Sequence, residues 1–295
     1  MKFNPPQTSF FTKGQRAQHG DSHIVINQCY VQHIPPRISL SSEDANAKRN
    51  LPVLFIHGGG LTGAMWEATP DRRPGWAHLA TQQPFNHPVY LIDAVDYGRS
   101  QRAPDALRLG ETEHRTAKDL WQLFRFGPLD RFDAREPFPN SQFPLAHMDD
   151  LLAMSAARRR TGDAVECAGI AAAIREIGPC HVVAHSHGGA LMLKLLDGDD
   201  QQAKRLVERL VLVEPWPVML NSARKMPRTL VVVGDHVEGH WLAEELMERC
   251  QRLDTEKLLH LPSVGITGNS HALMCDGNSD EVGRLVFEWL QESGV

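Results

Sequence analysis

Residues 181–189 read His-Val-Val-Ala-His-Ser-His-Gly-Gly, a short apolar run that leads into a serine flanked by small residues. A helical pattern follows, so the stretch predicts a sharp turn from a strand into a helix: the nucleophile elbow G-x-S-x-G, with Ala184 in place of the first glycine. Residues two positions before and after the serine come close together in such a turn, and only side chains as small as those of Ala184 and Gly188 fit. The turn would lift the Ser186 hydroxyl clear of the sheet, where a substrate can reach it.

The composition is that of a globular chain. It has 295 residues, of which 42% are hydrophobic, enough for a sizeable core in roughly one or two domains. The formal net charge is −5 and no basic block is long enough to form an arm, so we expect no nucleic-acid partner. Because no stretch approaches the roughly 20 apolar residues that span a bilayer, we also expect no membrane partner.

The N-terminal sequence and the cysteines bear on localisation. Residues 1–15 carry two prolines where a signal peptide would have its apolar run, so we expect a cytoplasmic protein. The five cysteines are an odd number without C-x-x-C spacing. This usage argues against a disulfide framework and against a zinc site.

Short apolar runs alternate with helical patterns along most of the chain. An alternating segment at 23–34 predicts a strand or a bent pair of strands. Further strands are predicted at residues 52–56, 88–92, 181–185, 209–213, 228–233 and 257–261, and helices at 163–177, 188–196, 241–253 and 279–290. The alternation predicts an α/β fold, a mostly parallel sheet with helices on both faces.

Residues 101–162 interrupt this alternation. The segment is rich in aromatic residues and prolines, and it contains two predicted helices, at 113–126 and 146–159. An aromatic insertion of this kind predicts a helical cap, or lid, over a pocket, with residues 1–100 and 163–295 forming the core. The alternative is that the segment is an additional layer of the core.

Polar residues follow several of the predicted strands. Chemistry in open α/β sheets gathers beyond the carboxyl ends of the strands, and Ser186, Glu214 and Asp235 each follow one such end. His271 lies between the last predicted strand and the last predicted helix. A serine hydroxyl is a weak nucleophile until a base takes its proton, so we expect His271 to be that base and a carboxylate to orient its ring.

Two carboxylates are candidates for the acid. Asp235 is at the position where most hydrolases of this architecture keep theirs, whereas Glu214 lies one strand earlier, with a turn fixed by Pro215 and Pro217. An oxyanion needs backbone N–H donors, which His187 and the loop 58–60 would supply.

We expect a substrate pocket and no metal. Gly60, Trp66, Phe124 and Trp216 are the candidate pocket residues, although Trp66 fits the core equally well. His236 and His240 are four residues apart, but the glutamate that follows the first histidine of a zinc-protease helix is replaced by Val237.

These motifs resemble those of the α/β-hydrolase superfamily. The blocks HGGGLTGAMWEATPDRRPGW (57–76), LFRFGP (123–128), LVLVEPW (210–216), VVVGDH (231–236) and GITGNSHALM (265–274) are similar to those of small bacterial esterases of the esterase 713 type. The resemblance implies an α/β-hydrolase fold with a cap and ester hydrolysis without a cofactor. It also implies a triad of Ser186, His271 and Glu214, with Gly59 and His187 as oxyanion donors.

The sequence therefore predicts a serine hydrolase that cleaves carboxylic esters or lactones through an acyl-enzyme. Its partner is a small-molecule ester or lactone, and the chain is compatible with a homodimer. Two alternatives stay open: acyl transfer or C–C bond hydrolysis on the same triad, and a non-catalytic ligand receptor on a hydrolase fold.

Overall fold

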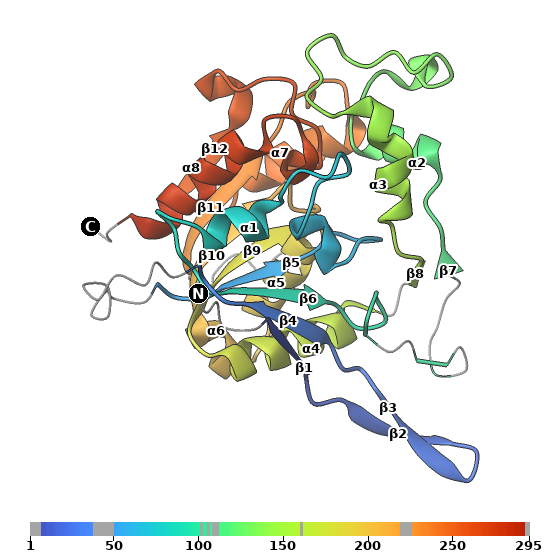
Figure 1. Cartoon of the computed structure of the whole chain (residues 1–295), viewed down its shortest axis with the longest axis vertical. Coiled ribbons are helices and arrows are strands. Elements are labelled where there is room, and N and C mark those ends of the chain that lie inside the picture. Colours follow the sequence, from blue (N-terminus) through green and yellow to red (C-terminus); the bar gives the residue numbers. More distant parts are fainter. Residues whose placement is uncertain are drawn as a thin grey trace, which may run out of the picture.

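An eight-stranded, mostly parallel sheet forms the centre of the protein (Figure 1). The computed structural model describes residues 7–37, 50–100, 103–104, 107, 112–159, 162–218 and 226–292. In spatial order the strands are β1 (Thr8–Phe11), β4 (Tyr30–Ile34), β6 (Val89–Asp93), β5 (Val53–Ile56), β9 (Cys180–His185), β10 (Val207–Val213), β11 (Arg228–Val233) and β12 (Lys257–His260). β4 is antiparallel to both β1 and β6, and the pairs from β6 to β12 are parallel.

The central strands read as continuous apolar runs because both faces of the sheet are covered. Every residue of β5 and β9 is buried. β9 lies between β5 and β10, with Ala184 opposite Ile56 on one side and Leu212 on the other. The glycine loop after β5, the serine after β9 and the carboxylate after β10 therefore leave the sheet side by side.

Helices cover the two faces of the sheet. One face packs against α1 (Trp76–Thr81) and α8 (Ser279–Gln291), and the other against α4 (Asp163–Ile177), α5 (His187–Asp197), α6 (Gln201–Leu206) and α7 (Trp241–Gln251). Successive residues of β9 alternate between the two faces: Val183 packs with α8, whereas Val182 and Ala184 pack with α4 and α5. The predicted α/β fold, a mostly parallel sheet with helices on both faces, is confirmed.

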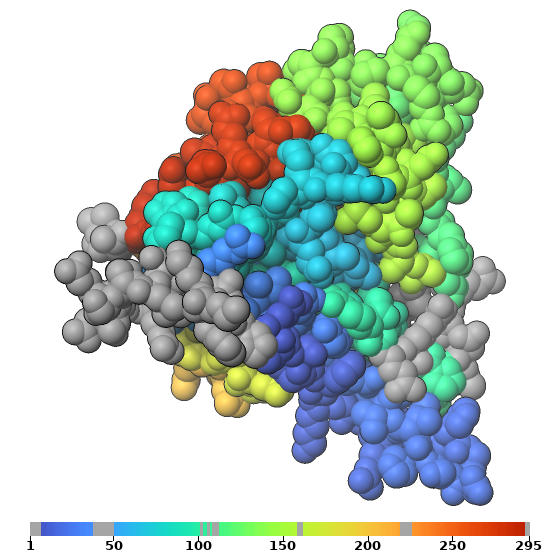
Figure 2. All heavy atoms as spheres, viewed as in Figure 1, coloured from blue at the N-terminus to red at the C-terminus, as the bar shows by residue number. Residues whose placement is uncertain are grey.

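The predicted segment 23–34 divides at Asn27, which has a φ of 65°. Its first half is β3 (Ser22–Ile26), which pairs with β2 (Gln15–His19) in a hairpin, and its second half is β4 in the main sheet. The hairpin projects from the body of the molecule (Figures 1 and 2). The sequence predicted the bend but not the hairpin, because residues 15–19 are largely exposed and polar.

The described part of the inserted segment contains β7 (Thr112–Glu113), α2 (Ala117–Leu123), α3 (Met148–Ala153) and β8 (Arg158–Arg159). Both helices are shorter than the sequence predicts. Thr116 is the N-cap of α2, and its side chain forms a capping box with Asp119. The segment's helices α2 and α3 lie in the lobe at the upper right of the molecule (Figures 1 and 2). Its buried side chains join the same apolar cluster as α1 and α8: Leu120, Trp121, Phe124, Phe126, Phe143, Met148 and Leu151. The segment is thus anchored in the core.

Short 3₁₀ helices complete the loops: η2 (Gly63–Trp66), η4 (Leu129–Arg131), η5 (Leu145–His147), η6 (Leu261–Val264) and η7 (Leu273–Cys275). Among the residues that the structure describes, we find no helix with the length and apolar character needed to cross a membrane.

His181, at the start of β9, gives stability a pH dependence. Burial, with His87 and Arg209 nearby, lowers its pKa from the ordinary 6.5 to about 4. The unfolded chain therefore gains a proton below pH 6.5 that the folded chain takes up only near pH 4. Within this window the free energy of unfolding falls as the pH falls, by up to about 1.4 kcal/mol per pH unit.

We expect His181→Gln to lose less stability than the wild type between pH 7 and pH 5 in urea unfolding. His23→Gln, on the exposed hairpin, is the control and should follow the wild type. Parallel losses in His181→Gln and the wild type would contradict this origin of the pH dependence.

Candidate active site

Ser186 occupies a strained turn between β9 and α5. Its φ is 50° and its ψ is −116°, a conformation that non-glycine residues rarely adopt. The turn is fixed by hydrogen bonds from Ser186 N to Val213 O (3.0 Å) and from Trp216 N to Ser186 O (2.9 Å). A Cβ on Gly188 would lie 2.5 Å from His57 O, so the space beside the serine admits no larger residue there. The strand-to-helix elbow is formed as the residue pattern predicts.

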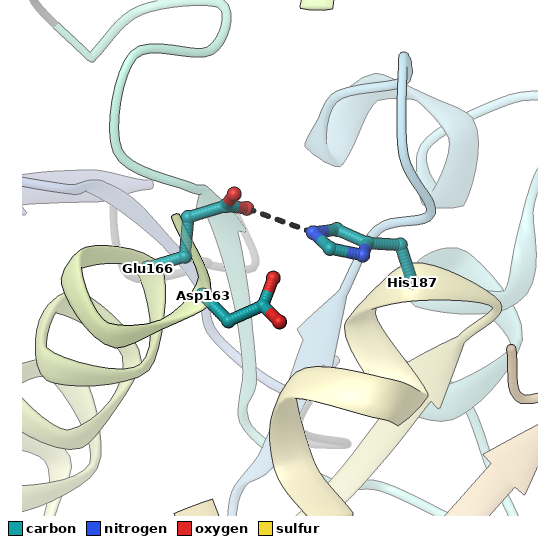
Figure 3. Close-up of side chains that lie close together, drawn as sticks. All are labelled: Asp163, Glu166 and His187. Carbon is teal, nitrogen blue, oxygen red and sulfur yellow. Dashed lines mark hydrogen bonds and ion pairs between the residues drawn. The ribbon is translucent and has the colours of Figure 1, made fainter. Parts of the chain in front are cut away.

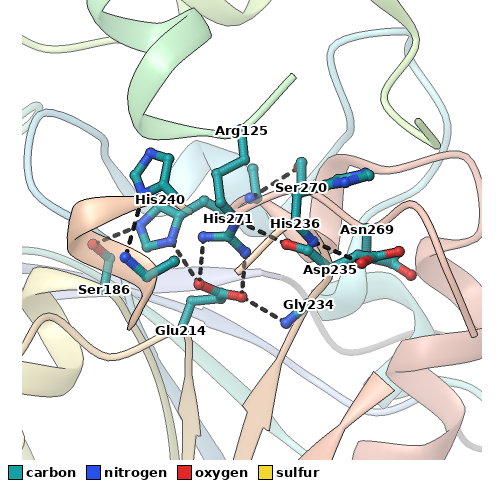
Figure 4. Close-up of polar contacts among 12 residues, drawn as sticks. Arg125, Ser186, Glu214, Gly234, Asp235, His236, His240, Asn269, Ser270 and His271 are labelled. Atoms are coloured by element: carbon teal, nitrogen blue, oxygen red, sulfur yellow. Dashed lines mark hydrogen bonds and ion pairs between the residues drawn. The ribbon is translucent and has the colours of Figure 1, made fainter. Parts of the chain in front are cut away.

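Ser186, His271 and Glu214 lie in hydrogen-bonding contact (Figure 4). His271 Nε2 is 2.9 Å from Ser186 Oγ, and His271 Nδ1 is 2.9 Å from Glu214 Oε2. A carboxylate only accepts, so Nδ1 carries the proton and Nε2 is left to accept from the serine hydroxyl. The arrangement places an imidazole, oriented by a carboxylate, within hydrogen-bonding distance of the serine hydroxyl.

Asp235 has other partners. Its Oδ2 accepts from Gly268 N (2.7 Å) and Asn140 Nδ2 (3.2 Å), and its Oδ1 accepts from His236 N (2.7 Å). This carboxylate therefore holds the loop that leads to His271, while Glu214 contacts the imidazole itself. Glu214 is thus the carboxylate in contact with His271, and Asp235 supports the loop.

Glu214 is fully buried and fully hydrogen-bonded. Oε1 accepts from Gly234 N (2.6 Å) and from Arg125 Nη2 (2.7 Å), and Oε2 accepts from His271 and from Arg125 Nη1 (3.0 Å). Burial alone would raise its pKa, but the charge of Arg125 and the hydrogen bonds of His271 and Arg125 outweigh it and hold the pKa of this carboxyl well below its usual range. Glu214 is therefore ionised at neutral pH.

His271 is buried and held from both sides. His185 Nε2 donates to His271 O (2.9 Å), and His271 N donates to Phe124 O (3.0 Å). Burial lowers the pKa of His271, Glu214 opposes that shift, and the charge of Arg125 adds to it. The net direction is downward, so the imidazole is neutral at pH 7, the form that accepts a proton.

The glycine loop after β5 lies against the elbow. A Cβ on Gly58 would be 2.5 Å from His185 Nδ1 and 3.3 Å from Ser186 Cβ. His57 braces the loop, since its Nδ1 donates to Gly58 O (2.8 Å) and its Nε2 accepts from Ala94 N (3.0 Å). Gly59 follows this contact, and Arg115 of the inserted segment donates to its carbonyl (3.1 Å).

His187 is the first residue of α5, where backbone N–H groups have no partner within the helix. Its side chain contacts Glu166 of α4 (3.2 Å), and Asp163 lies beside both (Figure 3). These three side chains offer ligand atoms within 4.8 Å of one another, a spacing that could hold a cation. The ammonium of Lys194, however, already contacts Asp163 and supplies a positive charge there.

The imidazoles of His236 and His240 have different partners. His236 stacks on Phe138 with ring centroids 3.9 Å apart, whereas His240 contacts Gln122 O through Nε2 (2.9 Å) and accepts from Ala243 N through Nδ1 (3.2 Å). Both imidazoles therefore have structural contacts of their own.

A cavity of about 880 Å³ lies between the inserted segment and α5. Its wall includes His187, Trp216 and Trp241, together with residues of α2, and the two tryptophans are 36% and 63% exposed. Trp216 N bonds Ser186 O, so this wall adjoins the serine.

The other predicted pocket residues lie elsewhere. Trp66 is completely buried in the core against Phe55 and Trp76, so the pocket prediction for it is wrong. The η2 helix turns its side chain toward the sheet. Gly60 lies under Arg115, and Phe124 is buried with its ring centroid 5.5 Å from that of His271.

Sequence reasoning missed Arg115, Arg125 and Trp241. Arg125 had a visible signal, a single cation within the aromatic run Leu-Phe-Arg-Phe-Gly at 123–127. A cation in such a run is buried only when it is paired, so it indicated a carboxylate partner. Trp241 had no such signal in the sequence, because it is the first residue of an ordinary amphipathic helix.

Residues 53–265 match the alpha/beta hydrolase family, and the chain belongs to that family. A solved bacterial esterase has a TM-score of 0.79 to this structure at 24% identity, over 98% of this chain and 97% of that chain. The resemblance to the α/β-hydrolase superfamily stated from the motifs is thereby confirmed, and the bacterial esterase shares the fold of this chain.

Two further relatives are more distant. A CIB-like hydrolase from Thermoplasma acidophilum has a TM-score of 0.53 at 13% identity, over 97% of this chain and 98% of that chain. A curated sequence from a fungal species, called a probable secreted lipase, is 23% identical over 325 residues, 84% of this chain and 83% of that protein. Cytoplasmic localisation stays a prediction.

We expect Gly58→Ala to destabilise the protein by about 1–3 kcal/mol, because the new methyl group meets the His185 ring in a packed site. Urea unfolding measures the change. Gly198→Ala is the control, since a Cβ there meets nothing closer than 3.4 Å. Equal stability of the two variants would show that the glycine loop can move away from His185, so that the short distance between Gly58 and His185 does not restrict the residue at position 58.

Proposed function

We propose that this protein is a serine hydrolase that cleaves carboxylic esters or lactones through an acyl-enzyme. The observation that supports the proposal most directly is the chain of two 2.9 Å contacts from Ser186 through His271 to Glu214. Membership of the alpha/beta hydrolase family supports hydrolysis in general. The similarity to a bacterial esterase and to a probable secreted lipase favours esters as the substrate class.

Each residue has a step in the proposed reaction. His271 Nε2 takes the hydroxyl proton as Ser186 Oγ attacks the ester carbonyl, and the N–H groups of Gly59 and His187 stabilise the oxyanion. The imidazolium then gives the proton to the departing alkoxide, which leaves an acyl-serine. Water, deprotonated by the same imidazole, then attacks the acyl carbon, and the imidazolium returns this proton to Ser186 Oγ as the acyl–oxygen bond breaks and the acid leaves. Glu214 keeps the imidazole in the required tautomer and stabilises its charged form.

The cavity of about 880 Å³ is the proposed substrate site. Trp216 and Trp241 offer exposed aromatic faces to an apolar acyl or alcohol group. The inserted segment supplies the opposite wall, so we propose that it acts as a fixed cap whose buried side chains belong to the core.

Purified protein should hydrolyse p-nitrophenyl acetate or butyrate, and Ser186→Ala should lose nearly all of this activity. A fluorophosphonate probe should label the wild type at Ser186 and leave folded Ser186→Ala unlabelled, because the probe needs an activated serine. A wild-type protein that neither hydrolyses esters nor reacts with the probe would favour a ligand receptor. Transfer of the acyl group to added alcohol in preference to water would favour acyl transfer.

Glu214→Gln should lower kcat by roughly 10⁴-fold, the scale that follows loss of a triad acid. Asp235→Asn is the matched variant and should cost far less, since Asp235 acts on the loop through Gly268 and Asn140. Steady-state kinetics on one ester, with circular dichroism as the check of folding, measure both. The reverse order of the two losses would assign the acid role to Asp235.

A further inference from the structure

We propose that Arg125 is a positioning residue for the hydrolytic triad: its guanidinium holds both oxygens of Glu214 and so fixes the carboxylate that contacts His271. The inference rests on the proposed function and goes beyond it, because Arg125 touches none of the reacting atoms and lies on the inserted segment.

The Arg125 side chain is built into the site. Only 2% of it is exposed, and its two terminal nitrogens donate to the two oxygens of Glu214. Its Nε donates to Asp235 O (2.9 Å), so one guanidinium joins the loops that follow β10 and β11 (Figure 4). This planar, two-pronged contact suits a guanidinium and not an ammonium.

The backbone around Arg125 is shaped for this contact. Arg125 has a φ of 58° and directly follows Phe124, the C-cap of α2. Arg125 N donates to Gln122 O (3.2 Å), and Phe126 N donates to Trp121 O (3.2 Å), which holds the unusual turn. Non-glycine residues adopt this region at a cost, and the buried ion pair offsets it.

The neighbouring residue holds the base. Phe124 O accepts from His271 N (3.0 Å), and the Phe124 ring lies beside the imidazole, tilted by 39° to it. Two consecutive residues of the inserted segment therefore contact the base and the acid. The segment takes part in assembling the triad as well as in covering the cavity.

Arg125 has two opposite effects on the imidazole. All four acceptor positions of the Glu214 carboxylate are used, two of them by Arg125, so the carboxylate has no freedom to rotate away from His271. The fixed positive charge, however, disfavours the imidazolium. Arg125 thus fixes the orientation of the Glu214 carboxylate. Its charge also lowers the pKa of His271, so the imidazole stays neutral at lower pH.

The titratable groups around His271 and Arg125 come from several elements: Glu214 after β10, His185 in β9, Arg115 before α2, Asp235 and His236 after β11, and His240 before α7. Of these, Glu214 contacts the imidazole directly, and Arg125 contacts Glu214.

The test compares Arg125→Met, Arg125→Lys and Arg131→Met on the purified full chain. Arg131 lies on the same segment, is exposed and pairs with Glu136, so it controls for loss of a positive charge. Rates are expressed per serine titrated with fluorophosphonate, so that a partly folded variant does not count as a slow one.

Arg125→Met should lower kcat by about 10²-fold, the cost of a misplaced catalytic group, and should move the acid limb of the kcat/KM profile to higher pH. Arg125→Lys should also lose kcat but keep the acid limb near that of the wild type, because the charge is retained. Arg131→Met should match the wild type in both. In the Glu214→Gln background, Arg125→Met should lower kcat by less than about threefold, since Arg125 acts through Glu214.

An unshifted acid limb in Arg125→Met, or wild-type kcat per titrated site in Arg125→Met and Arg125→Lys, would overturn the proposal. A wild type without esterase activity would instead overturn the proposed function. In that case NMR titration of His271 still tests Arg125, because Arg125→Met should raise the pKa of the imidazole whatever the substrate. An unchanged histidine titration would overturn the inference independently of hydrolysis.

Discussion

A buried carboxylate organises the functional end of this protein. Glu214 has no exposed surface, and an ionised carboxylate in such a place is tolerated only when its oxygens are hydrogen-bonded and its charge is balanced. Its donors come from three segments far apart in sequence: Arg125 in the inserted segment, Gly234 after β11 and His271 before α8. The geometry of the site therefore depends on these segments converging on one charge.

The sheet makes this convergence possible. Parallel neighbours β5, β9, β10 and β11 end at the same edge, so the glycine loop, the serine, the glutamate and Gly234 emerge in a row. The loop with His271 lies over this row, with His185 beneath it and Phe124 beside it. The inserted segment closes the arrangement through Phe124 and Arg125, and its aromatic residues continue into the core packed against α8. Lining the cavity and contacting Glu214 and His271 are thus two consequences of the same packing.

The strands and core helices could be predicted from the sequence because each is encoded in the pattern of its own consecutive residues. β5 and β9 are apolar runs bounded by turn residues, and α4 begins and ends as its pattern and Gly178 indicate. The helices of the inserted segment were predicted too long, because α2 stops where Arg125 turns toward Glu214, a tertiary contact that no local pattern contains. For Trp66, a residue on a short loop helix, the sequence does not say which way the side chain points. Ser186 and His271 were predicted from motif and order, whereas the residues left Glu214 and Asp235 both open as the acid, and the resemblance implied Glu214.

Glu214 and Asp235 have different partners for a physical reason. Glu214 follows β10, next to the serine strand, and has a φ of 49°, a strained backbone that turns its long side chain toward the imidazole. Asp235 follows β11, one strand further from the serine. It accepts from Gly268 and Asn140, where the two backbones approach so closely that a Cβ on Gly268 would overlap Asn140 O. A short carboxylate suits that close contact between the inserted segment and the His271 loop. The nearer, longer carboxylate therefore reaches His271 itself, and the more distant, shorter one joins the His271 loop to the segment that carries Arg125.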